Sequence, residues 1–451
     1  MFESVLVANR GEIAVRVIGT CQRLGVKAVA VHSEADAGAL HVRVADESVL
    51  LGPAPAAESY LDIGRVLEAA QVTGVQAIHP GYGFLAENAE FARRVTDAGL
   101  VWVGPAPEAI EAMGDKVAAR AAMAAAGVPV APGTDPLPDA DAAAAAAARI
   151  GYPVMVKAVA GGGGIGMAAV DDEPALRTAY ETARTRAERF FGSPAVFLER
   201  YLPHARHVEV QVLGLTDGRV LALGERDCSV QRRHQKVAEE TPSPGVTPAL
   251  RERMFAAARR AALAVDYRGA GTVECLVPAD GSGEFFFLEM NTRLQVEHPI
   301  TELVYGVDLV EEQLRVASGE GPNFDVDAVA PKGHAIELRV NAEDPKRFLP
   351  GPGAVTTWVE PTGEGVRVDS GYAAGTTVTP NYDSLMAKLI AYGPDRATAI
   401  ERVKAAAAAF EIAGPKCNLP FFAEVLENPE FVAGDYDTGI IGRMRAPKPK
   451  Q

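Results

Sequence analysis

The stretch Phe285-Phe-Phe-Leu-Glu289-Met-Asn291-Thr-Arg293-Leu-Gln295-Val-Glu297-His298 carries the strongest structural signal in the chain. Its first four residues are apolar and predict a buried strand. In an extended chain alternate residues share one face, so the polar residues at odd positions from 289 to 297 would point the same way. Nine extended residues span roughly 27 Å, too far for one small site. We therefore expect the chain to bend after Asn291.

The residue types in this stretch suit phosphate-dependent chemistry on a carboxylate-like substrate. A carboxylate and an amide oxygen two residues apart, as in Glu289 and Asn291, suit a hard cation such as Mg²⁺. Arg293 offers a planar fork to an anion, and the carboxylate of Glu297 is placed to act as a base. The alternative is an ordinary polar sheet face. The full alternation at the end of an apolar strand favours the site.

A second carboxylate lies in another apolar strand. Glu274 is part of Gly271-Thr-Val-Glu-Cys-Leu-Val277, and a buried unpaired carboxylate is costly. It therefore needs a cation. Two possibilities stay open, a metal shared with Glu289 and Asn291 or a salt bridge to an Arg or Lys.

Two further segments have the character of anion sites. Pro153-Val-Met-Val-Lys157 leads into a glycine-rich loop at 161–166, whose backbone N–H groups can close around phosphate oxygens. It lacks the Gly-Lys-Ser/Thr of a Walker A loop, and a plain flexible turn is the alternative. Gln231-Arg-Arg-His-Gln-Lys236 is a basic cluster that is either an anion site or a solvated loop. His79, His207 and His234 are candidate ligands, although each taken alone is more often structural.

The composition excludes several classes of protein. The chain has 451 residues, 48% hydrophobic and 23% charged, with a net charge of −15, which argues against sequence-independent nucleic-acid binding. No apolar run reaches the roughly 18 residues that a membrane span needs. Its four cysteines form no Cys-x-x-Cys pair, so we expect neither a zinc cluster nor disulfides and take the cytoplasm as the compartment. Cys228 is favoured as a structural cysteine rather than a nucleophile.

Apolar runs alternate with helical patterns at the start of the chain. Runs at 5–8, 26–31, 77–78 and 101–103 predict a parallel α/β sheet within residues 1–114. The proline-rich segment Pro129–Pro138 is a boundary candidate, and Asp139 before the alanines at 142–148 predicts a capped helix. Strands are predicted at 208–213, 220–223, 271–277 and 284–290. After about residue 335 we expect a curled antiparallel sheet, with strands at 354–359, 366–368 and 376–379, and a last helix at 396–410.

Together these segments resemble biotin carboxylase, an ATP-grasp ligase, from about residue 2 to about residue 445. The resemblance is carried by Val7-Ala-Asn-Arg-Gly-Glu-Ile13, His79-Pro-Gly-Tyr-Gly-Phe-Leu85, Met113-Gly-Asp-Lys116, the glycine loop, Glu225 to Lys236, Glu289 to His298 and Arg339-Val-Asn-Ala-Glu-Asp344. It implies an α/β fold with ATP-grasp architecture: a Rossmann-like N-terminal parallel-sheet domain (1–114), an ATP-grasp domain (115–334) with a mobile lid (about 131–203), a C-terminal α+β domain with a curled antiparallel sheet (335–446) and a tail (447–451).

The resemblance also implies an activity, the ATP-dependent carboxylation of biotin by bicarbonate through carboxyphosphate, with Mg²⁺ or Mn²⁺. It implies that ATP is bound by Lys116, Lys157, Gly163, Gly164, Glu199, Arg200, Tyr201, Leu202, His207, Gln231, His234, Glu274 and Glu289, and the metal by Glu274, Glu289 and Asn291. Bicarbonate is assigned to Lys236, Arg293, Gln295 and the Val296 backbone, the base to Glu297, and biotin to Arg339 and Tyr82. The catalytic set is then Arg293, Glu297, Lys236 and Arg339.

Two positions depart from the family pattern. Ile165 stands in the glycine loop where the family usually has Lys or Arg, and Ala160 replaces a frequent Gly. The missing charge leads to the hypothesis of weaker ATP binding or altered lid closure. Ile165→Lys is then expected to lower the KM for ATP, and an unchanged KM would contradict the hypothesis.

The sequence shows neither a Met-Lys-Met biotinylation motif nor a carboxyltransferase segment. We therefore expect a subunit that carboxylates biotin on a separate biotin carboxyl carrier protein, works with carboxyltransferase subunits of an acetyl-CoA or other acyl-CoA carboxylase, as in fatty acid biosynthesis, and forms a homodimer. Two alternatives remain at this stage: another ATP-grasp ligase, such as a carbamoyl-phosphate or purine-pathway enzyme, and a catalytically silent nucleotide-binding scaffold.

Overall fold

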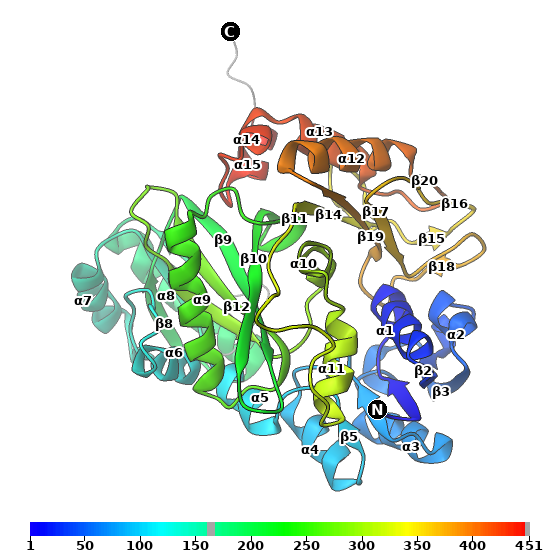
Figure 1. The fold of residues 1–451 in the computed structure, drawn as a ribbon. Helices are drawn as coiled ribbons and strands as arrows, with labels where there is room; N and C mark the ends of the chain where they lie inside the picture. Colours follow the sequence, from blue (N-terminus) through cyan, green and yellow to red (C-terminus); the bar gives the residue numbers. More distant parts are fainter. Residues whose placement is uncertain (160–166, 447–451) are drawn as a thin grey trace.

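The computed structural model describes residues 1–159 and 167–446 (Figure 1). The N-terminal part is blue in that view, the central part runs from cyan to yellow, and the C-terminal part is orange and red. The predictions for Ala160, Gly163, Gly164 and Ile165 lie outside the described residues. Among the helices of the described ranges, none is both long and apolar enough to cross a membrane.

The N-terminal part is a parallel sheet, as predicted. Its strands lie in the order β3-β2-β1-β4-β5, and all neighbours are parallel. They span β1 Ser4–Val7, β2 Lys27–Ser33, β3 Glu47–Gly52, β4 Ala77–His79 and β5 Val101–Trp102, and the helices are α1 Gly11–Arg23, α2 Leu40–Val44, α3 Ile63–Thr73, α4 Ala89–Asp97 and α5 Pro107–Gly114. The edge strand β3 was not predicted. Its Ser48 and Leu50 are exposed, so it lacks the continuous apolar run of a central strand.

The lid region forms a small α/β unit of its own. After α6 (Lys116–Ala125), it contains α7 (Ala140–Ile150), β6 (Val154–Ala158), β7 (Ala168–Val170), α8 (Glu173–Phe191) and β8 (Val196–Arg200), with strand order β7-β6-β8. The capped alanine helix is confirmed, because the Asp139 side chain accepts a hydrogen bond from Ala142 N (2.8 Å). The Pro129–Pro138 segment pairs with β13 at Val130 and with β8 at Gly133 and Leu137. It therefore connects the lid to the central sheet.

An eight-stranded sheet forms the middle of the molecule, in the order β13-β12-β9-β10-β11-β14-β19-β17. Its strands are β9 Ala205–Gly214, β10 Val220–Arg232, β11 Gln235–Thr241, β12 Gly269–Pro278, β13 Phe286–Asn291, β14 His334–Asn341, β17 Val366–Ser370 and β19 Leu385–Gly393, with helices α9 Pro248–Leu263, α10 His298–Tyr305 and α11 Leu309–Ala317. The pairing of β11 with β14 is antiparallel. The sheet is therefore continuous across residue 335, where we had expected a new domain to begin.

The C-terminal part corrects two predictions. The three expected strands do not share one sheet: β15 (Gly353–Ala354) pairs with β18 (Thr377–Val378), β16 (Thr357–Val359) pairs with β20 (Glu411–Ala413), and β17 joins the central sheet. The predicted last helix forms as α12 (Arg396–Ala409), but α13 (Leu419–Glu427), α14 (Pro429–Ala433) and α15 (Ile440–Arg445) follow it. Short strands bounded by Gly and Pro do not encode their pairing partners locally.

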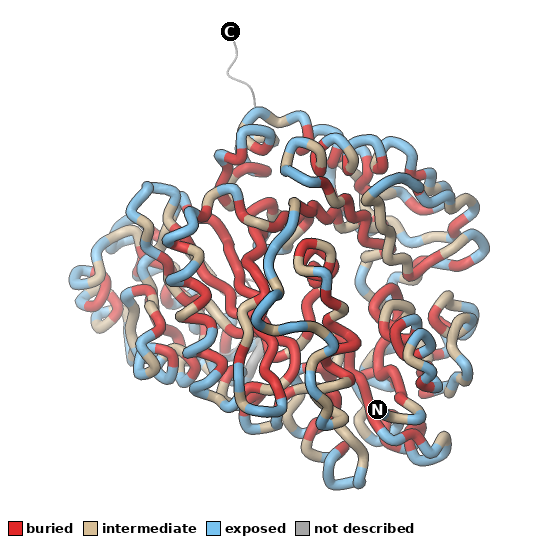
Figure 2. Tube along the Cα trace, viewed as in Figure 1, coloured by how far each residue is buried: buried red, intermediate tan, exposed pale blue. Residues whose placement is uncertain are grey.

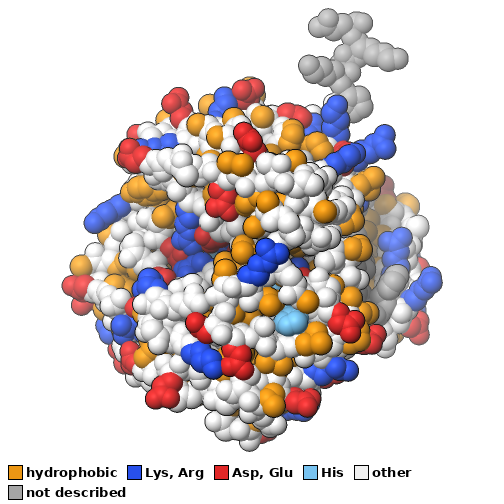
Figure 3. All heavy atoms as spheres, turned by 90° about the vertical axis from the view of Figure 1, so that its right-hand side faces the viewer, with side chains coloured by type: hydrophobic (Ala, Val, Ile, Leu, Met, Phe, Trp, Pro, Cys, Tyr) orange, Lys and Arg blue, Asp and Glu red, His pale blue; other side chains and the backbone are white. Residues whose placement is uncertain are grey.

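Buried residues run through the central strands and α10 (Figure 2). One core cluster joins Val5 and Ile13 of the N-terminal part to Leu309 and Leu314 of α11, so these elements pack as one body. Between the N-terminal and C-terminal parts the surface is hollowed, and basic and acidic side chains gather in the hollow (Figure 3). This arrangement places charged groups where the parts of the chain meet.

A buried acid ties the central sheet to the C-terminal helices. Glu240 on β11 accepts hydrogen bonds from His334 Nε2 (2.7 Å), Arg396 Nε (2.6 Å) and Tyr436 Oη (2.6 Å). Burial by itself raises the pKa of Glu240, but the hydrogen bonds from His334 and Arg396 outweigh it and lower the pKa to about 2. The folded state therefore holds this group ionised well below the pH at which an unfolded glutamate protonates.

Glu240→Gln is expected to reduce the free energy of unfolding by about 3 kcal/mol near neutral pH. Because the folded-state pKa is depressed, this stabilisation is present above the unfolded pKa of about 4.3 and is lost as the pH falls towards about 2. Urea unfolding of both proteins between about pH 7 and about pH 3 should show the difference shrinking. A difference that does not change with pH would contradict the assignment. Glu424→Gln, an exposed partner of Arg445, is the control.

Candidate active site

The chain bends where the sequence predicted. Strand β13 ends at Asn291, and α10 begins at His298. The bend is held by Glu87, which accepts hydrogen bonds from Thr292 N (3.1 Å) and Arg293 Nε (2.9 Å). Alternation along one strand face therefore stops at Asn291, and the later residues surround a site instead of extending past it.

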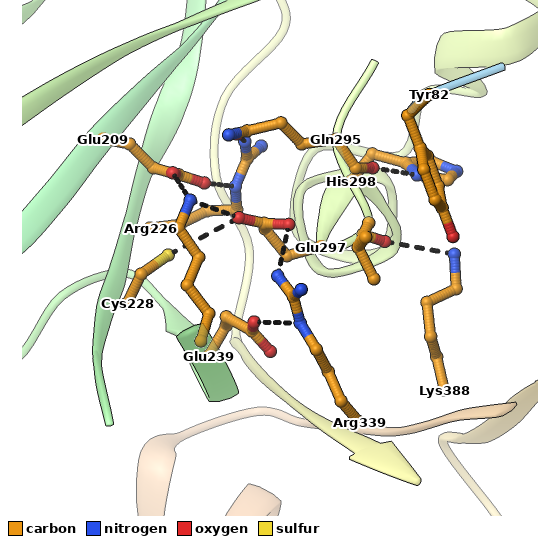
Figure 4. Close-up of polar contacts among 12 residues, drawn as sticks. Tyr82, Glu209, Arg226, Cys228, Glu239, Gln295, Glu297, His298, Arg339 and Lys388 are labelled. Atoms are coloured by element: carbon orange, nitrogen blue, oxygen red, sulfur yellow. Dashed lines mark hydrogen bonds and ion pairs between the residues drawn. The ribbon is translucent and has the colours of Figure 1, made fainter. Parts of the chain in front are cut away.

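At this bend Glu297 lies between two cations. Its Oε1 is 2.6 Å from Lys236 Nζ on β11, and its Oε2 accepts a hydrogen bond from Arg339 Nη2 (2.8 Å) on β14. Figure 4 shows Glu297 and Arg339 pointing towards one another, with Glu239 bound to the other side of the arginine through Arg339 Nε (2.6 Å). An acid, an ammonium and a guanidinium from three separate segments thus meet in a buried place.

The electrostatics keep all three of these groups charged. Burial raises the pKa of Glu297, but the nearby charges of Lys236 and Arg339 outweigh it and hold that pKa well below its usual range. Burial lowers the pKa of Lys236, whereas the surrounding carboxylates raise it well above the ordinary value. Glu297 is therefore a weak base while Lys236 and Arg339 are bound to it. It becomes a stronger base when an anion binds these cations in its place.

A fully buried arginine supports the site from behind. Arg226 donates hydrogen bonds to Glu209 Oε1 (2.6 Å), Gln211 Oε1 (2.6 Å), Thr272 Oγ1 (3.1 Å), Gln295 Oε1 (2.9 Å) and Thr301 Oγ1 (3.0 Å). Gln295 in turn donates to Glu274 Oε1 (2.7 Å). Arg226 therefore sets the orientation of the Gln295 amide, a role that we did not predict for it.

The predicted metal ligands come together on neighbouring strands. Glu274 of β12 and Glu289 of β13 are cross-strand partners, and Asn291 Nδ2 lies 2.9 Å from Glu274 Oε1. Burial and the charge of Glu274 raise the pKa of Glu289. Asn291 Oδ1 accepts a hydrogen bond from Arg293 Nη2 (3.0 Å), so the Asn291 amide presents its nitrogen, not its oxygen, to Glu274. Two neighbouring buried carboxylates are groups that a hard divalent cation neutralises, so Glu274 and Glu289 fit Mg²⁺.

The alternative considered for Glu274 is also present, since Lys236 Nζ lies 2.8 Å and His207 Nε2 2.8 Å from its two oxygens. Within the described ranges, two acidic clusters are compact enough for a metal: His207 with Glu209 and Glu274, and Glu209 with Cys228 and Glu297. Lys236 donates to all three of these carboxylates, so a protein cation already serves both clusters. Glu289 belongs to neither cluster, and the metal site of Glu274, Glu289 and Asn291 stays a prediction.

Several predicted nucleotide residues gather beside this point. Lys157 on β6 forms an ion pair with Glu199 on β8. His234 lies in the β10–β11 hairpin with φ +66°, and burial together with the charges of Lys157 and His207 lowers its pKa. The charge of Lys116 likewise lowers the pKa of Glu289, although burial and the charge of Glu274 raise that pKa by more. Gln231 pairs with Lys236 across that hairpin, and Arg200, Tyr201 and Leu202 continue from β8 towards the central sheet.

The predicted biotin loop is rigidly built. Asn9 Nδ2 donates to the carbonyls of Pro80 and Tyr82 (both 2.7 Å), and Gly81 has φ +64° where a Cβ would meet Asn9 Nδ2 at 2.9 Å. His79 Nδ1 accepts from Gly81 N (3.0 Å), and burial lowers the pKa of His79 to about 4. His79 is therefore a neutral structural histidine. The Tyr82 hydroxyl donates to Glu12.

Cys228 lies against the site without taking a nucleophile's role. Its Sγ is 3.9 Å from Glu297 Oε1, and burial raises the pKa of the thiol well above its usual range. The sulfur therefore stays protonated, as a structural cysteine does.

Three family models cover nearly the whole chain. "Biotin carboxylase, N-terminal domain" matches residues 1–110, "Carbamoyl-phosphate synthase L chain, ATP binding domain" matches 115–323, and "Biotin carboxylase C-terminal domain" matches 337–443. A biotin carboxylase of Halalkalibacterium halodurans is 52% identical over 98% of this chain and 97% of its own. The chain belongs to the biotin carboxylase family. The resemblance seen in the sequence is thus confirmed.

Other relatives and solved structures agree with this membership. A biotin carboxylase of Pseudomonas aeruginosa is 51% identical over 96% of both chains. The Campylobacter jejuni biotin carboxylase structure superposes with a TM-score of 0.95 at 43% identity, covering 98% of this chain and 99% of that one. The biotin carboxylase domain of Hydrogenobacter thermophilus 2-oxoglutarate carboxylase, solved as a dimer with MgADP and bicarbonate, gives 0.93 at 43% identity and covers 98% of each chain.

As a biotin carboxylase, the chain is an ATP-dependent ligase with ATP-grasp architecture, and it carboxylates biotin with ATP and Mg²⁺. The site also contains residues that we did not single out from the sequence: Glu12, Glu87, Glu209, Arg226, Glu239, His298 and Lys388. Glu12, Arg226 and His298 lie inside quoted motifs. The others carry no local signal, because each acts on a residue far away in the chain.

Proposed function

We propose that this chain transfers a carboxyl group from bicarbonate to biotin on a separate carrier protein, through carboxyphosphate. The chain of contacts Lys236–Glu297–Arg339 carries the proposal. In it the base, Glu297, directly contacts an anion-binding cation, Lys236, and a second fixed cation, Arg339. A carboxylation of biotin needs these three functions in sequence.

The first step is the activation of bicarbonate. Lys236, Arg293, Gln295 and the Val296 backbone bind the bicarbonate, and Glu297 takes its proton. The bicarbonate oxygen then attacks the γ-phosphoryl group of ATP, and ADP leaves. Lys116 and Lys157 stabilise the charge on the phosphates. Glu274, Glu289 and Asn291 would hold Mg²⁺, which would supply positive charge against the phosphate oxygens when bound.

The low pKa of free Glu297 fits this step. Glu297 is bound to Lys236 and Arg339 in the structure, and their charges make it a weak base. Bicarbonate competes for Lys236, so its arrival removes one of these charges from Glu297 and raises its pKa. The carboxylate thus becomes basic when its substrate is present.

The second step is the carboxylation itself. Carboxyphosphate breaks into CO₂ and phosphate, the phosphate removes the proton from biotin N1′, and N1′ bonds to the carbon of CO₂. The ureido oxygen of biotin gains negative charge during this proton transfer. Arg339 stabilises that oxyanion with its fixed guanidinium. Tyr82 lies beside the biotin ring.

Carboxyphosphate is labile in water, so the lid at about 131–203 serves to close over the nucleotide. Glu199, Arg200, Tyr201 and Leu202 form the adenine-binding connector of this lid, with His207, Gln231 and His234 opposite. We place the chain in a homodimer that works with a biotin carboxyl carrier protein and a carboxyltransferase, in the cytoplasm. The carboxyltransferase chooses the final acyl-CoA acceptor.

The test is ADP release from Mg·ATP and bicarbonate, with and without free biotin and with a biotinylated carrier domain. Turnover that needs bicarbonate and rises with biotin supports the proposal, and in Arg339→Met the biotin stimulation should fall at least about 100-fold. Arg347→Met, at an exposed position, is the matched control. Turnover indifferent to biotin would instead indicate another ATP-grasp ligase. ATP binding without turnover, even with the carrier, would indicate a silent scaffold.

A further inference from the structure

Two side chains contact the backbone carbonyl oxygens of the two residues that precede Glu297, the proposed base. His298 Nδ1 lies 2.8 Å from the carbonyl oxygen of Gln295, and Lys388 Nζ donates to the carbonyl oxygen of Val296 (3.1 Å) (Figure 4). The Gln295 carbonyl belongs to the peptide group whose N–H is that of Val296. The Val296 carbonyl belongs to the peptide group whose N–H is that of Glu297. The two contacts therefore act on the bicarbonate-facing backbone and on the base.

The proton on His298 can be assigned. The ring is fully buried, and burial together with the charge of Lys388 holds its pKa well below the usual range, so the ring is neutral and carries one N–H. The Gln295 carbonyl only accepts, which places that N–H on Nδ1. Nε2 has no hydrogen-bond partner among the described residues, and its nearest acid, Glu302, is 3.9 Å away. His298 is thus a neutral hydrogen-bond donor through Nδ1, and it does not carry protons.

Lys388 joins parts of the chain that are distant in sequence. It is fully buried on β19, with Nζ 2.9 Å from Glu12 Oε2 of α1 and 3.6 Å from Asp369 Oδ2 of β17. In the sheet it is the register partner of both Arg339 and Asp369. Glu12 also accepts the hydroxyl of Tyr82. A continuous chain of polar contacts therefore runs from the biotin loop through Glu12 and Lys388 to the Val296–Glu297 peptide group.

We infer that His298 and Lys388 are positioning residues for bicarbonate and for the base. By donating to the two carbonyls, they fix the peptide planes of Val296 and Glu297 and strengthen the N–H groups on the opposite side of each plane. Lys388 also couples the biotin loop to the base, because the carboxylate of Glu12 binds both Tyr82 and Lys388. The inference rests on the proposed function and adds residues to its site.

The test compares donor-removing with donor-keeping variants. His298→Leu removes the N–H and keeps an apolar volume, whereas His298→Asn keeps an N–H donor near the position of Nδ1. We expect His298→Leu to lower kcat/KM for bicarbonate about 10- to 100-fold and His298→Asn to restore most of it, with the Kd for ATP unchanged within about twofold. A role in overall stability alone would instead lower ATP binding and the urea midpoint together.

Lys388→Met leaves Glu12 without its buried partner, so the double variant Glu12→Gln/Lys388→Met guards against misfolding. The double variant should also raise the KM for biotin, because the coupling to Tyr82 is lost. Unchanged bicarbonate kinetics in His298→Leu and in the double variant would overturn the inference, and so would a loss that His298→Asn does not rescue.

The wild-type chain separates the two proposals. If it shows no bicarbonate-dependent turnover, the proposed function fails together with the inference. If it does show this turnover, the variants test the inference alone.

Discussion

Glu297→Gln is expected to lower kcat for bicarbonate-dependent ADP release by about 100- to 10,000-fold, the range of general-base contributions. The amide keeps the shape of the side chain but cannot take the bicarbonate proton. Lys236 would retain the carboxylates of Glu209 and Glu274, so the surroundings remain ionic. Steady-state kinetics at saturating ATP, together with direct measurement of the Kd for ATP, would show whether the loss lies in the chemical step.

The matched control is Glu401→Gln, which makes the same change at an exposed position on α12. It should leave kcat unchanged within about twofold. A kcat for Glu297→Gln within about tenfold of the wild type would assign proton removal to another group. A loss of ATP affinity equal to the loss of kcat would show that the substitution had disturbed the whole site.

Arg226→Met is expected to reduce the free energy of unfolding by about 3–5 kcal/mol, because it breaks a buried ion pair by removing one partner. Arg226 is fully buried and is the donor that satisfies Gln211, Thr272 and Gln295. Methionine fills part of the volume but leaves these oxygens without their donor. A lower urea midpoint should appear together with a higher KM for bicarbonate, since Gln295 loses its orientation.

Arg259→Met, at an exposed position on α9, controls for the change of residue type and should alter stability by less than about 0.5 kcal/mol. If Arg226→Met unfolds at the wild-type urea concentration, the buried network contributes little net stability.

Much of the site could be predicted from short stretches. The strip from Glu289 to Glu297, with a bend after Asn291, followed from residue types and from the length of an extended chain, and the structure has this bend. The capped helix after Asp139 followed from propensity and capping. These features depend on interactions between residues only a few positions apart, which a sequence displays directly.

The pairing of distant strands was the part that failed. The C-terminal strands were expected in one curled sheet. β15 does pair with β18 as that sheet would require, but β16 pairs with β20, and β17 pairs with β19 inside the central sheet. Two- and three-residue strands contain too few residues to specify a partner. Their pairing is selected by the burial of whole faces, which depends on the rest of the fold.

The sequence by itself determined the family, the parallel N-terminal sheet and the chemical types at the site: carboxylates, lysines and arginines in a recognisable order. Only the tertiary structure decided which charge meets which. It placed Arg226 behind Gln295, Glu87 against Arg293, and Lys388 on the peptide group before Glu297. Buried charges are stable only in pairs, and the partners come from strands and loops that are neighbours in space but far apart along the chain.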